Sequence, residues 1–305
     1  MSARFDLLGL GAVAVDELIY VDSYPAPDEK AHVLQTERQC GGLTATALVA
    51  ATRFGAKCVY AGALGDDNLS RFAIDRMREE GIDLDHLLVR SEARPVHSYI
   101  LIDQARATRN IFADARGVIG ADAAWPAAEL IGASRVLFID HFGLPGMLRA
   151  ARIAREQGIP IVADLERESG PEFRELVAIV DHLIMSSGFA RELTGAAEPA
   201  EAVQRLWSKE RNTVVVTAGA QGCWFKTDAL DAKIHHQPAF QVKIVDTTGC
   251  GDVFHGIYAA ALAEGVEVRR RILLASAAAA LKATQPGGQA GIPRRTALEE
   301  FLLKL

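Results

Sequence analysis

Short apolar segments alternate with amphipathic segments along most of the chain, and this alternation limits the possible folds more than any other feature. The apolar runs have the length and the β-branched content of buried strands, and they span residues 7–11, 59–62, 136–140, 159–164, 182–185 and 213–217. The segments between them have helical periodicity, in residues 43–54, 68–80, 147–157, 172–180 and 200–210. Strands that alternate with helices predict a mainly parallel sheet covered on both faces, which is a three-layer αβα sandwich.

Two segments interrupt the alternation. Residues 13–39 and 95–113 contain stretches in which polar and apolar residues alternate with a period of two, which is typical of antiparallel strands with one exposed face. We expect these segments to pair into a small β lid beside an α/β core made of residues 1–12, 40–94 and 114–305. A hairpin without a role in function is the alternative.

The bulk composition narrows the class of protein. Half of the 305 residues are hydrophobic, so the chain can bury one large core, and its formal net charge of -6 argues against a nucleic-acid binder. No run of 18 apolar residues occurs and the first residues lack a signal-peptide pattern, so we expect a cytoplasmic protein without membrane contact. The four cysteines are widely separated and indicate free thiols.

Two nucleotide-binding motifs are missing from the sequence. No Gly-x-Gly-x-x-Gly follows the first apolar run, which disfavours a dinucleotide-dependent oxidoreductase. No Gly-Lys-Ser/Thr occurs either, which disfavours a P-loop enzyme.

The segment Asp246-Thr247-Thr248-Gly249-Cys250-Gly251-Asp252 carries the strongest chemical signal. It follows a β-branched run, residues 242–245, and precedes a helix-like segment. Its two glycines allow a tight turn at the start of that helix, where free N–H groups attract anions. A carboxylate among these donors repels a phosphate unless it has a chemical task, so we interpret Asp252 as a base for a hydroxyl that attacks a phosphoryl group. A simple helix N-cap is the alternative.

Four polar residues fall at the carboxyl ends of predicted strands, where parallel sheets bind their ligands. They are Asp140, Asp164, Thr217 and Asp246. We therefore expect all four near a pocket.

The sequence resembles the ribokinase (PfkB-type) carbohydrate kinases over nearly its whole length. The C-terminal match is the 246–252 segment, and the N-terminal match is Gly41-Gly42 followed by Gly62-Ala63-Leu64-Gly65-Asp66-Asp67. Residues 237–240, 251–256 and 286–293 look most like the branch that includes sulfofructose kinases and ketohexokinase-like enzymes. The resemblance implies ATP-dependent phosphorylation of a sugar hydroxyl, a ribokinase-like fold with a lid, and a homodimer formed through the lid.

The resemblance also implies roles for particular residues. It makes Asp252 the base and Gly249, Cys250 and Gly251 the anion hole. The sugar-binding positions that it implies are Asp16, Gly41, Gly42 and Thr46, and Lys30 and Arg109 in the lid are candidates to meet an anionic group on the sugar. The implied nucleotide-binding positions are Thr217, Gly219, Gly222, Thr248, Ala279 and Gly288. ATP implies Mg²⁺, and a monovalent cation such as K⁺ is a further candidate.

Three positions depart from the family pattern. Thr46 stands where an Asn usually reaches the sugar. Ser186-Ser187-Gly188-Phe189 replaces the Asn-x-x-Glu motif that organises metal-bound water, which leaves Asp164 and Glu166 as weak metal candidates. Cys250 replaces an Ala, and a thiol at a helix N-terminus can have a lowered pKa, so a reactive thiol and a passive packing residue are both open.

The substrate is the least constrained feature. A neutral ketose or a related sugar is the leading interpretation, because Phe142 and Ala113 stand where a sulfonate cradle of a sulfofructose kinase would need polar or basic side chains. A nucleoside kinase would need aromatic side chains in the lid, and Tyr20, Tyr24 and Tyr99 are the candidates. A sugar-binding sensor without catalysis is a third alternative.

Overall fold

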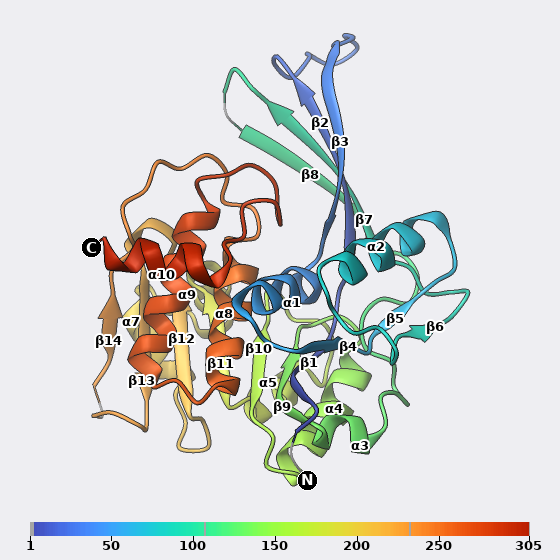
Figure 1. The fold of residues 1–305 in the computed structure, drawn as a ribbon. Coiled ribbons are helices and arrows are strands. Elements are labelled where there is room, and N and C mark those ends of the chain that lie inside the picture. Colours follow the sequence, from blue (N-terminus) through green and yellow to red (C-terminus); the bar gives the residue numbers. More distant parts are fainter. Residues whose placement is uncertain (1–2, 107, 232, 305) are drawn as a thin grey trace.

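An eight-stranded sheet forms the centre of the computed structural model, which describes residues 3–106, 108–231 and 233–304 (Figure 1). Its parallel strands lie in the order β4 (Cys58–Tyr60), β1 (Phe5–Leu10), β9 (Ser134–Ile139), β10 (Ile161–Asp164), β11 (His182–Ser186) and β12 (Thr213–Thr217). β13 (Cys223–Thr227) and β14 (His235–Gln237) extend the far edge in antiparallel pairing. A separate pair, β5 (Ala63–Leu64) and β6 (Leu88–Val89), is parallel.

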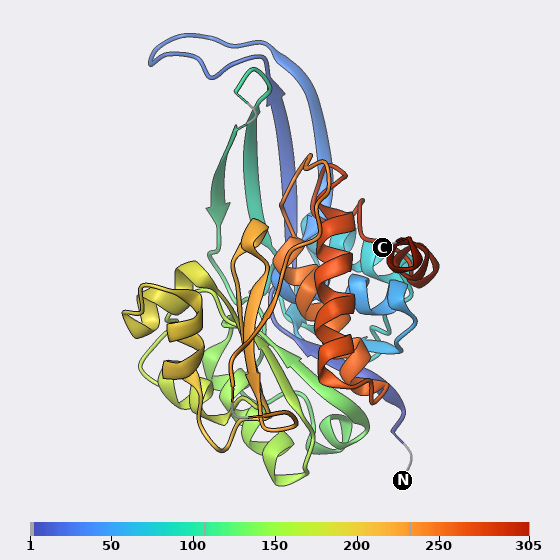
Figure 2. The same cartoon turned by 90° about the vertical axis from the view of Figure 1, so that its left-hand side faces the viewer.

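Helices cover both faces of this sheet (Figure 2). One face carries α1 (Leu43–Phe54), α2 (Asn68–Glu79), α8 (Cys250–Ala263), α9 (Val268–Lys282) and α10 (Arg295–Leu303). The other carries α3 (Ala128–Gly132), α4 (Leu144–Glu156), α5 (Phe173–Ile179), α6 (Ser187–Thr194) and α7 (Pro199–Leu206). In β12 the buried Val215 joins the first of these two cores, whereas Val214 and Val216 join the second. The predicted three-layer fold is confirmed.

A second sheet of four strands projects from one end of the main body (Figures 1 and 2). Its order is β3 (Val33–Gly41), β2 (Ala14–Val21), β7 (Val96–Asp103) and β8 (Thr108–Asp114). The outer pairs are antiparallel as expected, but the central pair of β2 and β7 is parallel. We call this sheet the lid. Tyr99 and Phe112 are cross-strand partners on it and are 44% and 58% exposed.

α1 and α8 cross at van der Waals contact because Gly256 lacks a side chain. A Cβ at this position would overlap the carbonyl oxygen of Ala47. Since α1 begins at Leu43 and α8 at Cys250, the crossing holds the first turns of the two helices near the same edge of the sheet. Only glycine permits this approach, so we expect the two N-termini to keep a fixed relative position.

Two expectations about secondary structure are wrong. The helix expected over residues 200–210 ends at Leu206, because Trp207 leaves the helical conformation and its ring lies beneath the Lys226 ammonium, 5.2 Å from it. Residues 242–245 form no strand. Ile244 and Val245 are 58% and 55% exposed there, and Val242 and Ile244 line a cavity instead of joining a sheet. Asp246 consequently follows a loop and not a strand.

Within the described residues, no helix is long and apolar enough to cross a membrane.

Candidate active site

The loop that precedes α8 is shaped by the Asp246 side chain. Its Oδ1 accepts hydrogen bonds from the backbone N–H and the hydroxyl of Thr248, at 2.8 and 2.7 Å, and its Oδ2 accepts one from the N–H of Gly287 at 2.9 Å. Gly249 then takes a left-handed conformation with φ 77°, and a Cβ there would lie 2.7 Å from the carbonyl oxygen of Gly288. Among the described residues, no side chain caps the start of α8. The N–H groups of this first turn are therefore available to an anion.

Asp252 lies in the same first turn, in an acidic cluster. The carboxyl groups of Asp164, which ends β10, and of Glu166 lie close enough to act on its charge. Burial first, and then the charges of Asp164 and Glu166, raise the pKa of Asp252 well above its usual range. A carboxylate with a raised pKa binds a proton more strongly, which suits the general base that the sequence predicts at this position.

His255 lies one turn further along α8 and faces this cluster. Its Nδ1 is 2.8 Å from the carbonyl oxygen of Gly251 and 3.3 Å from Asp164 Oδ2, and its Nε2 is 3.2 Å from the carbonyl oxygen of Ile184. Both ring nitrogens thus face acceptors. The ring ties the start of α8 to the ends of β10 and β11.

The acidic cluster also fits a weakly held divalent cation. Asp164 Oδ2 is buried and lies 3.3 Å from His255 Nδ1, but no well-aligned hydrogen bond from the described residues reaches it, so this oxygen can accept one from a metal-bound water. No group of three or more His, Cys, Asp or Glu side chains within the described residues forms a complete cage. Mg²⁺ is commonly bound by one or two carboxylates, its own waters and phosphate oxygens, so Asp164 and Glu166 could serve as its protein partners.

Asp140, which follows β9, is fully buried, and its carboxylate is hydrogen-bonded to the protein itself. Its Oδ2 accepts hydrogen bonds from the N–H of Ala12 at 2.6 Å and the hydroxyl of Thr44 at 2.9 Å, and its Oδ1 accepts one from the N–H of Phe142 at 2.8 Å. Burial raises the pKa of Asp140 to about 7. Since protein donors occupy both oxygens, this residue positions the turn between β1 and the lid.

Polar and glycine residues gather where the lid joins the core. Asp16 on β2 lies beside Ser98 on β7, and burial raises the pKa of its carboxyl group although the Ser98 hydroxyl partly offsets this. A Cβ on Gly41 would overlap Asp16 Oδ2, and Gly42, with φ 95°, has no room for one because the N–H nitrogen of Ala14 would be 2.6 Å away. The two glycines therefore leave the carboxylate of Asp16 accessible to a ligand.

Residues 286–289 connect this region to the α8 loop. Gly288 donates its N–H to Gln39 Oε1 on β3 at 3.2 Å, and Gln289 donates an amide N–H to the hydroxyl of Thr46 on α1 at 3.2 Å. Gly287 already bonds Asp246. Sequence reasoning missed Gln39 and Gln289. Only the match of the 286–293 segment to the family could have drawn attention to it.

The two lid cations proposed for the sugar lie elsewhere. Lys30 is exposed in the loop between β2 and β3, at the end of the lid away from the main body (Figure 2). Arg109 on β8 instead reaches the α8 loop, where its Nη1 lies 3.2 Å from Asp246 Oδ1. Neither side chain joins Asp16.

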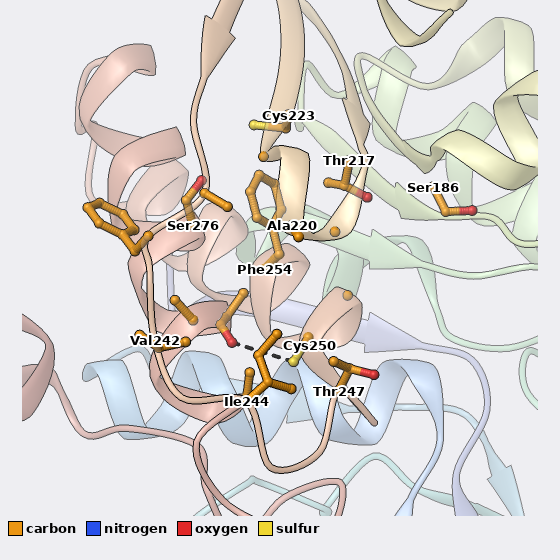
Figure 3. A pocket seen from close by; sticks show the side chains of 18 of the residues that line it. Ser186, Thr217, Ala220, Cys223, Val242, Ile244, Thr247, Cys250, Phe254 and Ser276 are labelled. Atoms are coloured by element: carbon orange, nitrogen blue, oxygen red, sulfur yellow. Dashed lines mark hydrogen bonds between the residues drawn. The ribbon is translucent and has the colours of Figure 1, made fainter. Parts of the chain in front are cut away.

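A cavity of about 390 Å³ lies at the α8 N-terminus, where Cys250 and Gly251 are part of its lining (Figure 3). The turn between β12 and β13 forms one wall with Thr217, Gly219 and Gly222, and Ala279 of α9 forms another. Side chains that sequence reasoning missed complete it, mainly Val242, Ile244, Phe254, Ser276 and Cys223. The walls are mostly apolar, and the size suits a flat heterocycle with its phosphates directed to the helix N-terminus. Thr248 and Gly288, the other two expected nucleotide-binding positions, are not among the residues that line this cavity. Thr248 is bonded to Asp246, and Gly288 is bonded to Gln39.

Residues 186–189, which stand in place of the Asn-x-x-Glu motif, lie in surroundings that do not suit a glutamate at position 189. Ser186 caps α6, with its Oγ accepting the N–H of Phe189 at 3.3 Å. The Phe189 ring is buried and packs edge-on against Phe173 with centroids 5.9 Å apart. A glutamate in this environment would bury an unpaired charge, so phenylalanine and the loss of the motif are consistent with each other.

Cys250 has a raised and not a lowered pKa, contrary to one of the two sequence interpretations. Its Sγ lies 3.4 Å from the carbonyl oxygen of Ala279, and burial raises its pKa to about 11. The helix N-terminus does not overcome this burial.

We expect iodoacetamide to label Cys250 slowly at pH 7 and about tenfold faster for each pH unit up to about pH 10, because only the thiolate reacts. ATP should slow the reaction, since Cys250 lines the cavity. Peptide mass spectrometry over this pH range measures both effects. A rate that levels off below about pH 9 would show a thiol of ordinary or lowered pKa.

Comparisons with known proteins agree with this geometry. The model of the pfkB family carbohydrate kinases matches residues 8–295. A ribokinase from Haemophilus influenzae is 28% identical over 308 residues, covering 98% of this chain and 99% of the relative. The crystal structure of a "putative ribokinase" from Agrobacterium tumefaciens is 30% identical with a TM-score of 0.89, covering 98% of both chains.

Two further matches both cover nearly all of this chain but different shares of the matched protein. The structure of Arabidopsis thaliana ribokinase complexed with ribose and ATP is 20% identical with a TM-score of 0.85, covering 99% of both chains, and supports the fold. A bifunctional ribokinase/ribose-5-phosphate isomerase A from Fructilactobacillus sanfranciscensis is 27% identical over 303 residues, which are 96% of this chain. The matched region spans only 55% of that relative.

Proposed function

Because the chain belongs to the pfkB family of carbohydrate kinases and is an ATP-dependent carbohydrate kinase, we propose that its acceptor is a hydroxyl of a neutral monosaccharide, a ketose or a related sugar. The observation that supports this most directly is the position of Asp252. It lies in the first turn of α8, where its neighbours Cys250 and Gly251 line the apolar cavity, and residues 287 and 289 bond Asp246 in the α8 loop and Thr46 on α1.

We assign the chemical roles as follows. Asp16 accepts hydrogen bonds from sugar hydroxyls and orients the ring against Gly41 and Gly42. Asp252 accepts the proton of the attacking hydroxyl. The N–H groups of the turn from Gly249 to Gly251 hold the charge that develops on the transferred phosphoryl group, and the lid limits access of water.

Mg²⁺ bound with ATP would neutralise phosphate charge during the transfer. Asp164, through its buried Oδ2, and Glu166 would hold its waters. This arrangement replaces the missing Asn-x-x-Glu motif with carboxylates from the end of β10.

The lid geometry favours a neutral sugar over an anionic one. Arg109 is paired with Asp246, and Lys30 is remote from Asp16, so neither cation is placed to hold a sulfonate of a sulfofructose. A nucleoside is disfavoured because Tyr24 already donates its hydroxyl to the carbonyl oxygen of Leu101 at 2.9 Å within the lid. Ribose is a second candidate, since the named relatives are ribokinases.

ADP release from MgATP, measured across a panel of sugars, tests the proposal. The panel should contain ketoses, ribose and other aldoses, sulfofructose, sugar acids and nucleosides, with Asp252→Asn as the blank. We expect the largest rate with a neutral ketose or with ribose. A larger rate with sulfofructose, a sugar acid or a nucleoside would show that the substrate class proposed here is wrong.

We further propose that two lids pair in a homodimer and that the enzyme acts in the cytoplasm. The exposed Tyr99 and Phe112 lie side by side on adjacent strands and form an apolar surface that a second lid could cover.

We expect Phe112→Asp to convert the dimer into a monomer, because a charge at the centre of an apolar interface is not solvated. Light scattering coupled to size-exclusion chromatography measures the mass. Val89→Asp, at an exposed residue on β6 outside the lid, is the control that should remain a dimer. A wild-type protein that is a monomer at micromolar concentration would contradict the proposal.

A further inference from the structure

Lys282 is a fully buried lysine beside the phosphoryl-binding loop, and the roles assigned above do not use it. It is the last residue of α9, and its side chain has 0% exposure. Its Nζ donates a hydrogen bond to the carbonyl oxygen of Asp246 at 2.9 Å. A lysine this deeply buried is unusual, because removing an ammonium from water is unfavourable unless negative groups compensate.

The charged groups around Lys282 supply that compensation. Burial lowers the pKa of Lys282, and the neighbouring Arg109 lowers it further, whereas Cys250, Asp246 and Asp252 favour the charged form. The side chain of Asp246 is engaged by Thr248, Gly287 and Arg109, so the ammonium binds the backbone of this residue and not its carboxylate. Lys282 therefore places one positive charge directly on the main chain of the loop.

That contact closes a set of bonds between the loop and the end of α9. Val245 and Asp246 both donate their N–H groups to the carbonyl oxygen of Ala283, at 2.7 and 3.1 Å. Gly287 donates to the Asp246 carboxylate. None of these three bonds involves a positively charged group. The Lys282 ammonium is the one cation among the described groups that hold this segment through its backbone. The position of the following residues, Gly249 to Gly251, depends on this anchored segment.

We propose that Lys282 is a built-in monovalent cation that holds the phosphoryl-binding loop in place of a dissociable ion. A free cation such as K⁺ orders a loop by attracting its carbonyl oxygens, and the Lys282 ammonium makes that contact with Asp246 through a covalent tether. The K⁺ that the family resemblance left open therefore does not fit this loop. Lys282 is a positioning residue, and it acts through the N–H groups of residues 249–251.

Removal of the ammonium should create a dependence on monovalent ions that the wild type lacks. We expect wild-type turnover to differ by less than about twofold between K⁺, NH₄⁺, Na⁺ and choline buffers. In choline buffer, Lys282→Ala should lower kcat by about tenfold or more, with the KM of the sugar changed less. NH₄⁺ or K⁺ should restore the rate along a saturable curve, because either ion can enter the space that the side chain leaves.

A binding measurement without any sugar keeps this test separate from the identity of the substrate. K⁺ and NH₄⁺ should raise the Tm of Lys282→Ala saturably relative to choline and leave the wild-type Tm unchanged. Lys226→Ala is a matched control, since Lys226 on β13 is another largely buried lysine. Its Nζ donates to Gln204 Oε1 at 3.2 Å and makes no hydrogen bond to the described residues of the α8 loop. It should show no ion dependence. If Lys282→Ala is unfolded, Lys282→Ser, which also leaves space for an ion, serves for the same measurements.

Three results would overturn the proposal. A wild type that loses tenfold or more of its activity without K⁺ would show a separate ion site. A folded Lys282 variant with normal activity in choline would show that the charge is not needed. A folded, impaired variant whose rate and Tm respond to neither NH₄⁺ nor K⁺ would reduce Lys282 to a packing role.

Discussion

Asp252→Asn is expected to lower kcat by about 10²-fold or more while ATP still binds. The amide has nearly the same shape as the carboxylate but cannot accept the proton of the attacking hydroxyl. The substitution also removes one of the mutually repelling carboxyl groups, which include Asp164, so we expect the Tm to stay the same or rise. Steady-state ADP release gives kcat, and isothermal titration with MgATP gives the affinity for the nucleotide.

A matched variant separates this effect from a general loss of a carboxylate. Asp85→Asn changes an exposed residue in the segment between α2 and β6 and should retain full activity. If Asp252→Asn keeps near-normal turnover with the best sugar, Asp252 is not the base. The base would then have to be another member of the acidic cluster, Asp164 or Glu166.

Asp16→Ala is expected to raise the KM for the sugar by roughly 10²-fold and to change the KM for ATP by less than about threefold. A charged acceptor contributes more than a neutral one to each hydrogen bond with a hydroxyl, and a carboxylate can accept two such bonds. Asp16→Asn retains one acceptor oxygen and should give an intermediate effect. Initial rates over a matrix of sugar and ATP concentrations provide both constants.

Glu17→Gln is the control for this prediction. Glu17 is the next residue on β2, points to the opposite face of the lid sheet, and pairs with Arg38 at 2.5 Å. It should leave the KM for the sugar within about twofold. Equal changes in the KM of sugar and ATP for Asp16→Ala would place Asp16 outside the sugar pocket.

The fold was predictable because the hydrophobic pattern repeats with the period of each element. β12 and α1 occupy the expected residues, since both lie in the core where burial fixes their pattern. Residues 242–245 have the same β-branched composition as a strand but border a cavity, and composition does not distinguish the two environments. The antiparallel edge formed by β13 and β14 was not expected either, because both strands are short and the three residues of β14 are all polar.

Within the site, residues that act through local geometry were easier to predict than residues that act across the fold. Asp252 and Gly249 follow from a helix start that is visible in seven consecutive residues. The roles of Arg109 and Lys282 depend on contacts with Asp246 over 137 and 36 positions, and the sequence on either side of each gives no indication of a partner. Cys250 shows a related difficulty, because its pKa depends on how deeply the folded protein buries it.

The contact between Gly256 and Ala47 has a consequence for how this enzyme could acquire new substrates. The start of α1 and the start of α8 behave as one rigid platform, so a change that shifts one end of the sugar pocket also displaces the base. The lid strands are free of that constraint, since Ser98 and Gln39 approach Asp16 from the second sheet. Substrate preference can therefore diverge through substitutions in β3 and β7 while the platform is inherited unchanged, and directed evolution toward a different sugar should begin with these two strands.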